Sequence, residues 1–157
     1  MDEQRVKKGT VGEQVVSDAF ERLGYHVDVV SGASVYRKGK QIYGPIDLNV
    51  CSKGSSYAVQ VKHKEPRTYY PDTGMELWRY NGLKEREKVS GIPCLVLFMD
   101  DGTITWDTDF GNPRIYGEWL KNLNGCISPF GSKNNVDNVT MIYFSLDKLK
   151  KLGSLVP

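Results

Sequence analysis

The chain has 157 residues, a length typical of one domain, and we expect residues 1–157 to form a single unit. Apolar residues make up 39% and charged residues 25% of the chain, which excludes a disordered or collagen-like protein. Lys and Arg outnumber Asp and Glu by only 21 to 19, so the net charge of +2 does not by itself indicate a nucleic-acid partner.

Cysteine usage and the apolar runs indicate the compartment. The three cysteines Cys51, Cys94 and Cys126 are far apart and form no CxxC pair, which argues against a disulfide framework and against zinc. The longest apolar stretch, Cys94–Met99, is too short to span a membrane. The charged segment Met1–Lys8 is unlike a signal peptide. We therefore expect a cytoplasmic protein without membrane contact.

The spacing of the apolar residues predicts an α/β protein. A wide apolar stripe runs from Thr10 to Leu23, with Thr10 as a good N-cap and Gly24 as a good stop, and predicts a helix. The most apolar strand, Ile92–Met99, should lie centrally in a sheet. Further strands are predicted at Tyr25–Val30, Ile46–Cys51, Tyr57–His63, Thr103–Trp106 and Val139–Ser145, and further helices at Met75–Val89, Ile115–Asn122 and Leu146–Leu152. This order predicts a central mixed sheet flanked by helices.

The second and third strands carry the polar residues of interest. They are joined by a short turn containing Gly54, so we expect a hairpin. Alternation places Ile46, Leu48 and Val50 on one face of the first strand of this pair and Asp47 on the other. If the apolar faces of the two strands align, then Asp47, Gln60 and Lys62 lie on the same side.

An acid, an amide and an amine on neighbouring strands suit phosphodiester hydrolysis. This reaction needs charge neutralised on the phosphate and a water activated, and a hard divalent cation does both. Mg²⁺ prefers oxygen ligands, which Asp47, the Gln60 side chain and the Val61 backbone carbonyl can supply. Lys62 would then stand beside the attacking water or the phosphate as a compact positive charge.

Two stretches of this sequence resemble a known nuclease superfamily. Gly44-Pro45-Ile46-Asp47 followed by Gln60-Val61-Lys62 resembles the PD-(D/E)XK nucleases. Lys8-Gly9-Thr10-Val11-Gly12-Glu13, the helix ending Leu23-Gly24-Tyr25 and the following Ser31-Gly32-Ala33-Ser34 are similar to archaeal Holliday junction resolvases of that superfamily. The resemblance covers roughly the first half of the chain. It implies a restriction-endonuclease-like core and metal-dependent cleavage of DNA.

The resemblance also implies roles for individual residues. Glu13 matches the acidic metal ligand carried by a helix, Asp47 the metal-binding aspartate, and Lys62 the catalytic lysine. Gln60 takes the place of the usual Glu, which removes one negative charge from the site. Some branches of the superfamily, including intron-encoded homing endonucleases and VRR-Nuc-type nucleases, are similar to this sequence in having Gln there.

Simpler interpretations exist for the same residues. Thr10-Val11-Gly12-Glu13 has the pattern of a capping box, in which Glu13 would satisfy a backbone amide at a helix start. Asp47 could be a polar residue on the solvent face of an edge strand. His63 falls on the apolar side of its strand and is expected to be packed rather than catalytic.

The charge is uneven along the chain. Between Tyr36 and Arg67 there are seven positive and two negative residues, so the region around the predicted site is basic. We expect phosphate contacts from Lys7, Lys8, Arg37, Lys38, Lys40, Lys64 and Arg67. The loop tyrosines Tyr69 and Tyr70 are candidates for stacking on bases. Ordinary solvated lysines would explain the same composition.

The sequence therefore predicts an α/β domain that hydrolyses DNA phosphodiester bonds as an endonuclease, with Mg²⁺ as cofactor and Mn²⁺ as a substitute. Branched DNA such as a Holliday junction, a specific duplex site and free ends are competing substrates. One site per domain favours a dimer or higher homo-oligomer for double-strand chemistry. Two alternatives are a nucleic-acid-binding module of the same fold that has lost cleavage, and a protein-interaction domain.

Overall fold

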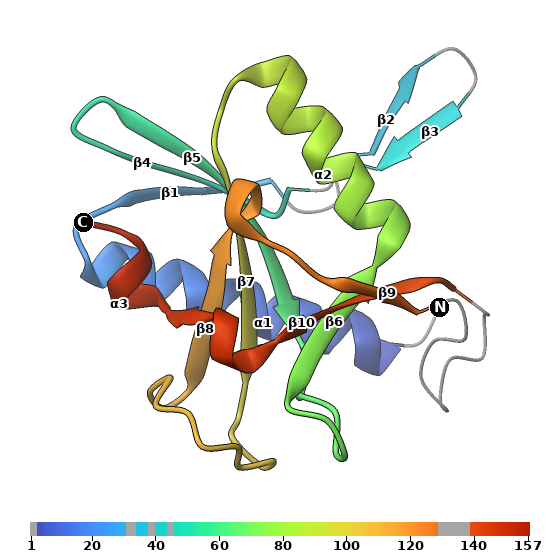
Figure 1. Ribbon diagram of the computed structural model, residues 1–157. Helices are drawn as coiled ribbons and strands as arrows, with labels where there is room; N and C mark the ends of the chain where they lie inside the picture. The colour runs from blue at the N-terminus through green and yellow to red at the C-terminus, as the bar shows by residue number, and fades with distance from the viewer. Residues whose placement is uncertain (1–2, 31–33, 38–39, 44–45, 129–138) are drawn as a thin grey trace.

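The computed structural model describes residues 3–30, 34–37, 40–43, 46–128 and 139–157 (Figure 1). Its centre is a six-stranded sheet with the strand order β1-β4-β5-β7-β8-β11. The strands are β1 (His26–Val29), β4 (Leu48–Ser52), β5 (Ser55–His63), β7 (Cys94–Asp100), β8 (Arg114–Trp119) and β11 (Lys150–Lys151). β5 and β7 pair in parallel and all the other neighbours pair antiparallel, so the predicted mixed sheet is confirmed.

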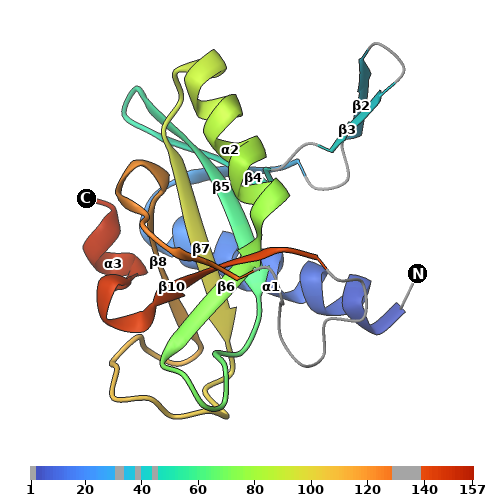
Figure 2. The same ribbon diagram turned by 45° about the vertical axis from the view of Figure 1, so that its right-hand side comes forward.

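Helices cover both faces of this sheet (Figures 1 and 2). α1 (Glu3–Arg22) and the short α3 (Leu152–Leu155) pack on one face, and α2 (Leu77–Ser90) packs on the other. Beside α2 lies a second sheet in the order β6-β10-β9, made of β6 (Asp72–Glu76), β10 (Met141–Ser145) and β9 (Cys126–Ser128). A hairpin of β2 (Ser34–Arg37) and β3 (Lys40–Tyr43) and the short 3₁₀ helices η1 (Leu120–Asn122) and η2 (Leu146–Lys148) complete the chain.

The central sheet separates two apolar cores. β7 is buried along its whole length, and its side chains alternate between the two. Val96 and Phe98 face the core under α2, whereas Leu95 and Leu97 face the core under α1. This double burial explains the continuous apolar run of Ile92–Met99 and confirms its predicted central position.

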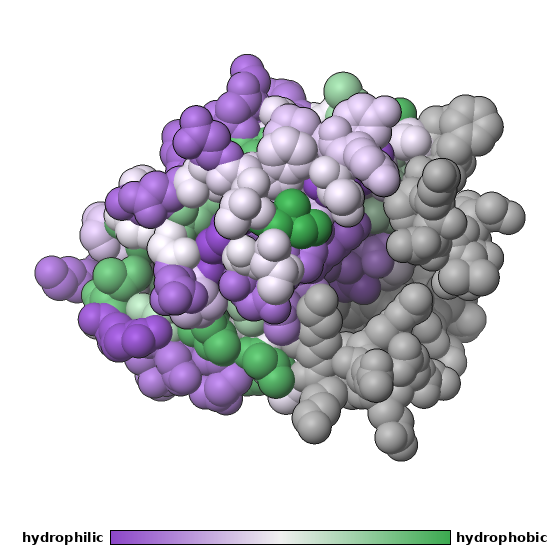
Figure 3. Space-filling view, turned by 90° about the horizontal axis from the view of Figure 1, so that it is seen from below, coloured by the Kyte–Doolittle hydropathy of each residue, from purple (hydrophilic) through white to green (hydrophobic). Residues whose placement is uncertain are grey.

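The coloured part of the face seen in Figure 3 is mostly polar. Figure 3 shows the molecule from below, where polar residues cover most of the coloured surface and apolar residues form only small patches. In the part of the chain that the structure describes, every helix is too short or too polar to cross a membrane.

Several sequence predictions for the C-terminal half are wrong. Ile115–Asn122 is not a helix, because β8 covers most of it and only η1 follows. Gly117 explains the close pairing of β8 with β7, because a Cβ there would overlap the Val96 carbonyl oxygen. Thr103–Trp106 is irregular rather than a strand, and Leu146–Leu152 divides into η2, β11 and the start of α3.

Candidate active site

Asp47 lies at a bend just before β4, where the chain enters the central sheet. Its Oδ2 accepts a hydrogen bond of 2.8 Å from the Val61 backbone N–H on β5. The bend turns Ile46 toward the core under α2, whereas Leu48 faces the core under α1. The prediction that Ile46 and Leu48 share one face is therefore wrong, because regular strand alternation begins only after Asp47.

Glu13 belongs to the middle of α1. The helix begins at Glu3, so Thr10 is inside it and the predicted capping box is wrong. α1 crosses β5 closely at Gly12, where a Cβ would lie 2.8 Å from the Cβ of His63. His63 is thus packed against the helix, as its position on the apolar side of β5 predicts. The close crossing brings the Glu13 carboxyl within hydrogen-bonding reach of Asp47.

The Asp47 carboxyl is perturbed by its surroundings. Burial and then the adjacent Glu13 raise the pKa of Asp47 from its ordinary 3.8 to about 6, against the lowering effect of the Val61 N–H and of Arg79. Two acids that share a half-buried site in this way repel each other when both are ionised. A cation placed between them would relieve that repulsion.

Gln60 is 2% exposed and lies one residue before the Val61 amide that holds Asp47. Its Nε2 donates a 3.1 Å hydrogen bond to the Val61 carbonyl. Its Oε1 is buried and has no hydrogen-bond partner among the residues that the structure describes. A buried oxygen without a hydrogen-bond partner lowers the stability of the fold. The Gln60 Oε1 is therefore available to accept from a further donor or to bind a cation.

Lys62 is held by a carboxylate that the sequence did not single out. Its Nζ lies 2.7 and 3.1 Å from the two oxygens of Glu76, at the end of β6. Burial lowers the pKa of Lys62, and the Glu76 carboxylate opposes that change. Burial in turn would raise the pKa of Glu76, but Lys62, helped by Arg79, outweighs it and lowers the pKa to about 2. The Glu76 carboxyl is therefore ionised at neutral pH.

Arg79 is the second residue that sequence reasoning missed. It lies on the first turn of α2, with its Nε 3.4 Å from Glu76, and its charge also lowers the pKa of Asp47. Neither Glu76 nor Arg79 is part of a recognisable motif. They reach the site because β6 and α2 fold back over the end of β5.

The residues predicted to contact phosphate are placed only in part. Lys64 donates to the Gly74 carbonyl at 3.3 Å, and Arg67 binds both oxygens of Asp72 at 2.6 Å. The side chains of Lys7, Lys8, Arg37 and Lys40, and all of Lys38, lie outside the described residues. Gly44 and Pro45 of the predicted motif lie outside them as well.

The oxygen atoms at this site are of mixed kinds. No group of three or more His, Cys, Asp or Glu side chains able to hold a metal occurs in the described ranges. A cation here would therefore have to combine the two carboxylates with neutral oxygens, namely Gln60 Oε1 and the Val61 carbonyl. Hard cations such as Mg²⁺ accept such mixtures and retain several waters, so the residues fit an Mg²⁺ ion.

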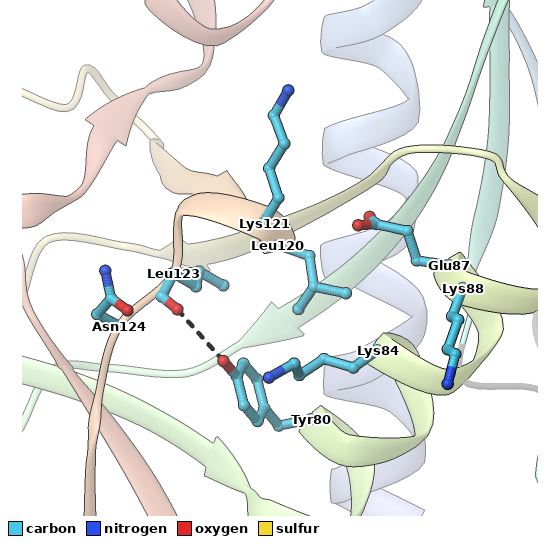
Figure 4. A pocket seen from close by; sticks show the side chains of 8 residues that line it. All are labelled: Tyr80, Lys84, Glu87, Lys88, Leu120, Lys121, Leu123 and Asn124. Atoms are coloured by element: carbon cyan, nitrogen blue, oxygen red, sulfur yellow. Dashed lines mark hydrogen bonds between the residues drawn. The ribbon is translucent and has the colours of Figure 1, made fainter.

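A separate pocket of about 320 Å³ lies between α2 and η1 (Figure 4). Tyr80 lines it and donates a 3.2 Å hydrogen bond to the Leu123 carbonyl. Lys84 and Lys121 also line it, and the Lys84 amine points toward the Tyr80 ring. None of Glu13, Asp47, Gln60 or Lys62 lines this pocket. This pocket is therefore separate from the candidate active site around Asp47.

Comparison with known proteins gives a structural relative and no sequence relative. No family model matches the sequence, and no curated protein matches it. Among solved structures, a Holliday junction resolvase, Hjc, from the archaeal hyperthermophile Archaeoglobus fulgidus superposes with a TM-score of 0.60. The alignment covers 94% of this chain and 93% of that chain at 10% sequence identity. The fold is that of a Holliday junction resolvase.

This resolvase-like fold confirms the predicted architecture, a mixed sheet flanked by helices with a nuclease-like core. In it, the Asp47 carboxyl, just before β4, accepts from the Val61 N–H and lies beside Glu13 of α1. Gln60 donates to the carbonyl of the same Val61, and Lys62 is close enough to Asp47 for their charges to interact. The predicted site residues are thus close together in space.

Proposed function

We propose that this protein is a divalent-cation-dependent deoxyribonuclease of the PD-(D/E)XK type that hydrolyses phosphodiester bonds. The observation that carries the proposal is the convergence of Glu13, Asp47 and the Gln60–Lys62 segment within a resolvase-like fold. A partly buried acid whose pKa is raised by burial and by a neighbouring carboxyl, close to a lysine, is an arrangement typical of a functional site.

The oxygen atoms at the site support Mg²⁺ as cofactor, with Mn²⁺ as a substitute. Asp47 and Glu13 would supply the anionic ligands, and Gln60 Oε1 and the Val61 carbonyl the neutral ones. When bound, such a cation lowers the pKa of a coordinated water and offsets charge on the phosphate.

The protein's own residues position the reacting groups. The Val61 N–H fixes the orientation of the Asp47 carboxylate, and Glu76 fixes the Lys62 ammonium at the end of β5. Lys62 then faces the charge that develops on the phosphate, where a fixed cation in a partly dry site is effective. Gln60, as a neutral ligand, leaves the site less negative and so reduces the repulsion of incoming DNA.

We also infer that the substrate is branched DNA and that the protein works as a homo-dimer. The structural relative is a Holliday junction resolvase, and opening a four-way junction requires two cuts. One site per chain supplies one cut, so a symmetric pair of chains would supply both. Lys7, Lys8, Arg37, Lys38 and Lys40 remain the proposed additional contacts with DNA phosphates.

A second candidate is a DNA-binding module that does not cleave. Gln60 in place of an acid favours it, since a neutral ligand removes one negative charge from the site and weakens cation binding. In that case DNA binding would not depend on Mg²⁺, and no substrate would be nicked.

A cleavage assay separates these functions. Supercoiled plasmid, linear duplex and a synthetic four-way junction are incubated with Mg²⁺ or Mn²⁺, with EDTA as the blank. The proposal requires cutting that EDTA stops and that Asp47→Asn and Lys62→Met abolish. Asp109→Asn in an exposed loop and Lys151→Met on β11 are the matched controls and should cut like wild type. Binding of the junction without cutting would favour the second candidate.

A further inference from the structure

Three cations follow one another from the end of β5 along β6. Each cation contacts one residue of β6, and the three contacted residues are every second one along that strand. The pairs are Lys62 with the Glu76 carboxylate, Lys64 with the Gly74 carbonyl, and Arg67 with the Asp72 carboxylate. The outer two partners are carboxylates and the middle partner is an uncharged carbonyl, so this row of three cations has no counter-charge of its own at Lys64. Burial and then the charge of Lys62 lower the pKa of Lys64, and the Glu76 carboxylate opposes them. A phosphate group at Lys64 would supply the missing negative charge.

Arg67 ends the row inside a stack of aromatic rings. Its guanidinium carbon lies 3.8 Å from the ring centre of Tyr143 and 4.6 Å from that of Tyr70. The two 2.6 Å hydrogen bonds to Asp72 fix the plane of the guanidinium. Such two-point pairing and stacking make Arg67 a rigid support for the Tyr70 ring.

Tyr70 is held firmly and is nevertheless 59% exposed. Its carbonyl accepts a 2.7 Å hydrogen bond from the Asp72 N–H, and the next residue, Pro71, accepts one of 2.9 Å from Leu146. The adjacent Tyr69 is 86% exposed and has none of the stacking contacts of Tyr70. A pre-ordered, exposed aromatic ring loses little entropy when a ligand stacks on it.

A pocket of about 260 Å³ opens beside this ring. Tyr70 and Arg67 line it together with Tyr143 of β10 and Cys126 of β9. Tyr143 and Cys126 are cross-strand partners, so their side chains lie on the same face of the sheet, the face on which Arg67 stacks. The exposed Tyr70 ring therefore stands beside an open pocket that also contains the Cys126 thiol, and we call this pocket the Tyr70 slot.

We propose that the Tyr70 slot binds an unpaired nucleobase, stacked on the Tyr70 ring, of a DNA strand whose phosphate rests at Lys64. The proposal rests on the proposed function and names the substrate feature that the same site recognises. Stacking on an aromatic side chain beside a cationic groove is the general mode of single-strand binding. A base buried in duplex cannot enter such a slot.

The position of the slot fixes where the unpaired base lies relative to the cut. Four residue steps of β6 separate Glu76, beside Lys62, from Asp72, beside Arg67. At about 3.4 Å per residue this is about 14 Å, or about four nucleotide steps of B-form DNA. The substrate would therefore be DNA with unpaired nucleotides within a few positions of the scissile bond, as at a branch or a frayed end.

The exposed thiol of Cys126 gives a direct readout of the slot. The full-length protein in EDTA is mixed with single-stranded oligo-dT, with the matching duplex or with a four-way junction, and alkylation by iodoacetamide is followed by mass spectrometry. We expect oligo-dT to slow the alkylation of Cys126 at least tenfold. Cys51 on β4 is the internal reference, and its rate should not change. This measurement needs no substitution and no cleavage.

Two variants test the stacking itself. Tyr70→Ala should weaken oligo-dT binding about five- to hundredfold, the range of one stacked base, and remove the protection of Cys126. Tyr69→Ala, the neighbouring control, should bind oligo-dT like wild type and should retain the protection of Cys126. An equal loss in the two variants, or binding of oligo-dT that leaves Cys126 unprotected, would overturn the slot.

The remaining outcomes separate this inference from the proposed function. Equal protection by duplex and by oligo-dT would mean that the slot does not read an unpaired base. Protection by an RNA strand alone would reject DNA as its ligand. Failure to bind DNA of any kind would reject the proposed function itself, whereas junction cleavage that is indifferent to Tyr70→Ala would reject only the slot.

Discussion

The Lys62 ammonium and the Glu76 carboxylate form a 2.7 Å ion pair between the end of β5 and the end of β6, with less than a third of either side chain exposed. Glu76 keeps the charge of Lys62 in a place where burial would otherwise favour the neutral amine. A lysine that must offset phosphate charge near neutral pH needs such a partner.

Glu76→Gln should therefore destabilise the protein by about 1–3 kcal/mol at pH 7, because a partly buried ammonium loses its counter-charge. The pKa of Glu76 is lowered to about 2 in the folded state, so its stabilising effect is present above pH 4.5 and disappears as the pH falls toward 2. Urea unfolding at pH 7 and at pH 3 measures the free energy of unfolding of variant and wild type. The difference between the two proteins should be smaller at pH 3.

Glu85→Gln, on the exposed side of α2, is the matched control and should change stability little at either pH. In a double-mutant cycle, Lys62→Met should recover part of the loss caused by Glu76→Gln. Equal effects of Glu76→Gln and Glu85→Gln would contradict the ion pair. The ¹⁵N or ¹³C titration of Lys62 by NMR should also show a lower pKa in the Glu76→Gln protein.

Asp47→Asn should make the metal-free protein more stable at pH 8. The pKa of Asp47 is raised to about 6 when folded, so folding favours the protonated acid, and this stabilisation is lost as the pH rises from about 4 through 6. An uncharged amide avoids the repulsion with Glu13 and can still accept the Val61 N–H. We expect a gain of about 1–3 kcal/mol at pH 8, measured by urea unfolding in EDTA.

The same pair of proteins tests cation binding. Mn²⁺ should raise the melting temperature of the wild-type protein at pH 8, because a ligand that binds only the folded state stabilises it. It should leave that of Asp47→Asn almost unchanged. Asp109→Asn, in the exposed loop before β8, should respond like wild type. An equal Mn²⁺ response in all three proteins would place the cation elsewhere.

The polar grouping on the hairpin was predictable because strand alternation needs only local sequence. Val59 and Leu48 are paired as a hairpin requires, and this register brings Gln60 beside Asp47. Glu76 and Arg79 were not predictable, because they arrive through β6 and α2, whose position over β5 depends on long-range packing. The bend at Asp47, which turns the Ile46 side chain to the opposite face of the sheet from Leu48, is also not indicated by any local sequence pattern.

The misassigned segment Ile115–Asn122 shows a second limit of sequence reasoning. Its apolar residues are spaced so that both a helix and a strand fit them. The segment forms a strand because Gly117 allows its backbone to lie close to Val96 on β7, so that β8 pairs with β7 in the central sheet. Glu118 on the same strand is buried and pairs with Lys150 of β11, a partner that no local pattern indicates.

Gln60→Glu should strengthen cation binding. The extra carboxylate adds charge to the ligand set, and we expect the Kd for Mn²⁺ to fall at least about tenfold in calorimetric titration. The metal-free variant should be less stable than wild type at pH 8, since a third acid would join Asp47 and Glu13. Asn124→Asp in the pocket of Figure 4 adds the same charge away from the site and should not change the Kd. An unchanged Kd in Gln60→Glu would exclude residue 60 from the ligands.

Gly12→Ala and Gly82→Ala should change stability in opposite directions, although both replace a glycine within a helix. Ala is preferred to Gly in helices by up to about 1 kcal/mol, and a Cβ at Gly82 on α2 meets nothing within 4 Å, so Gly82→Ala should stabilise the protein. A Cβ at Gly12 would stand 2.8 Å from the Cβ of His63 on β5. The His63 Cβ is fixed by the backbone and cannot move away by a change of rotamer. Gly12→Ala should therefore push α1 from the sheet and cost about 1–3 kcal/mol in urea unfolding.

The displacement should also reach the site, because Glu13 is the next residue of α1. Gly12→Ala should weaken the stabilisation by Mn²⁺ and slow junction cleavage, whereas Gly82→Ala should leave both intact. If Gly12→Ala destabilised the protein but retained full cleavage and the full Mn²⁺ response, then Glu13 would not be a ligand. The two acids would in that case be neighbours by packing alone, and Asp47 would act with Gln60 and Val61 without help from α1.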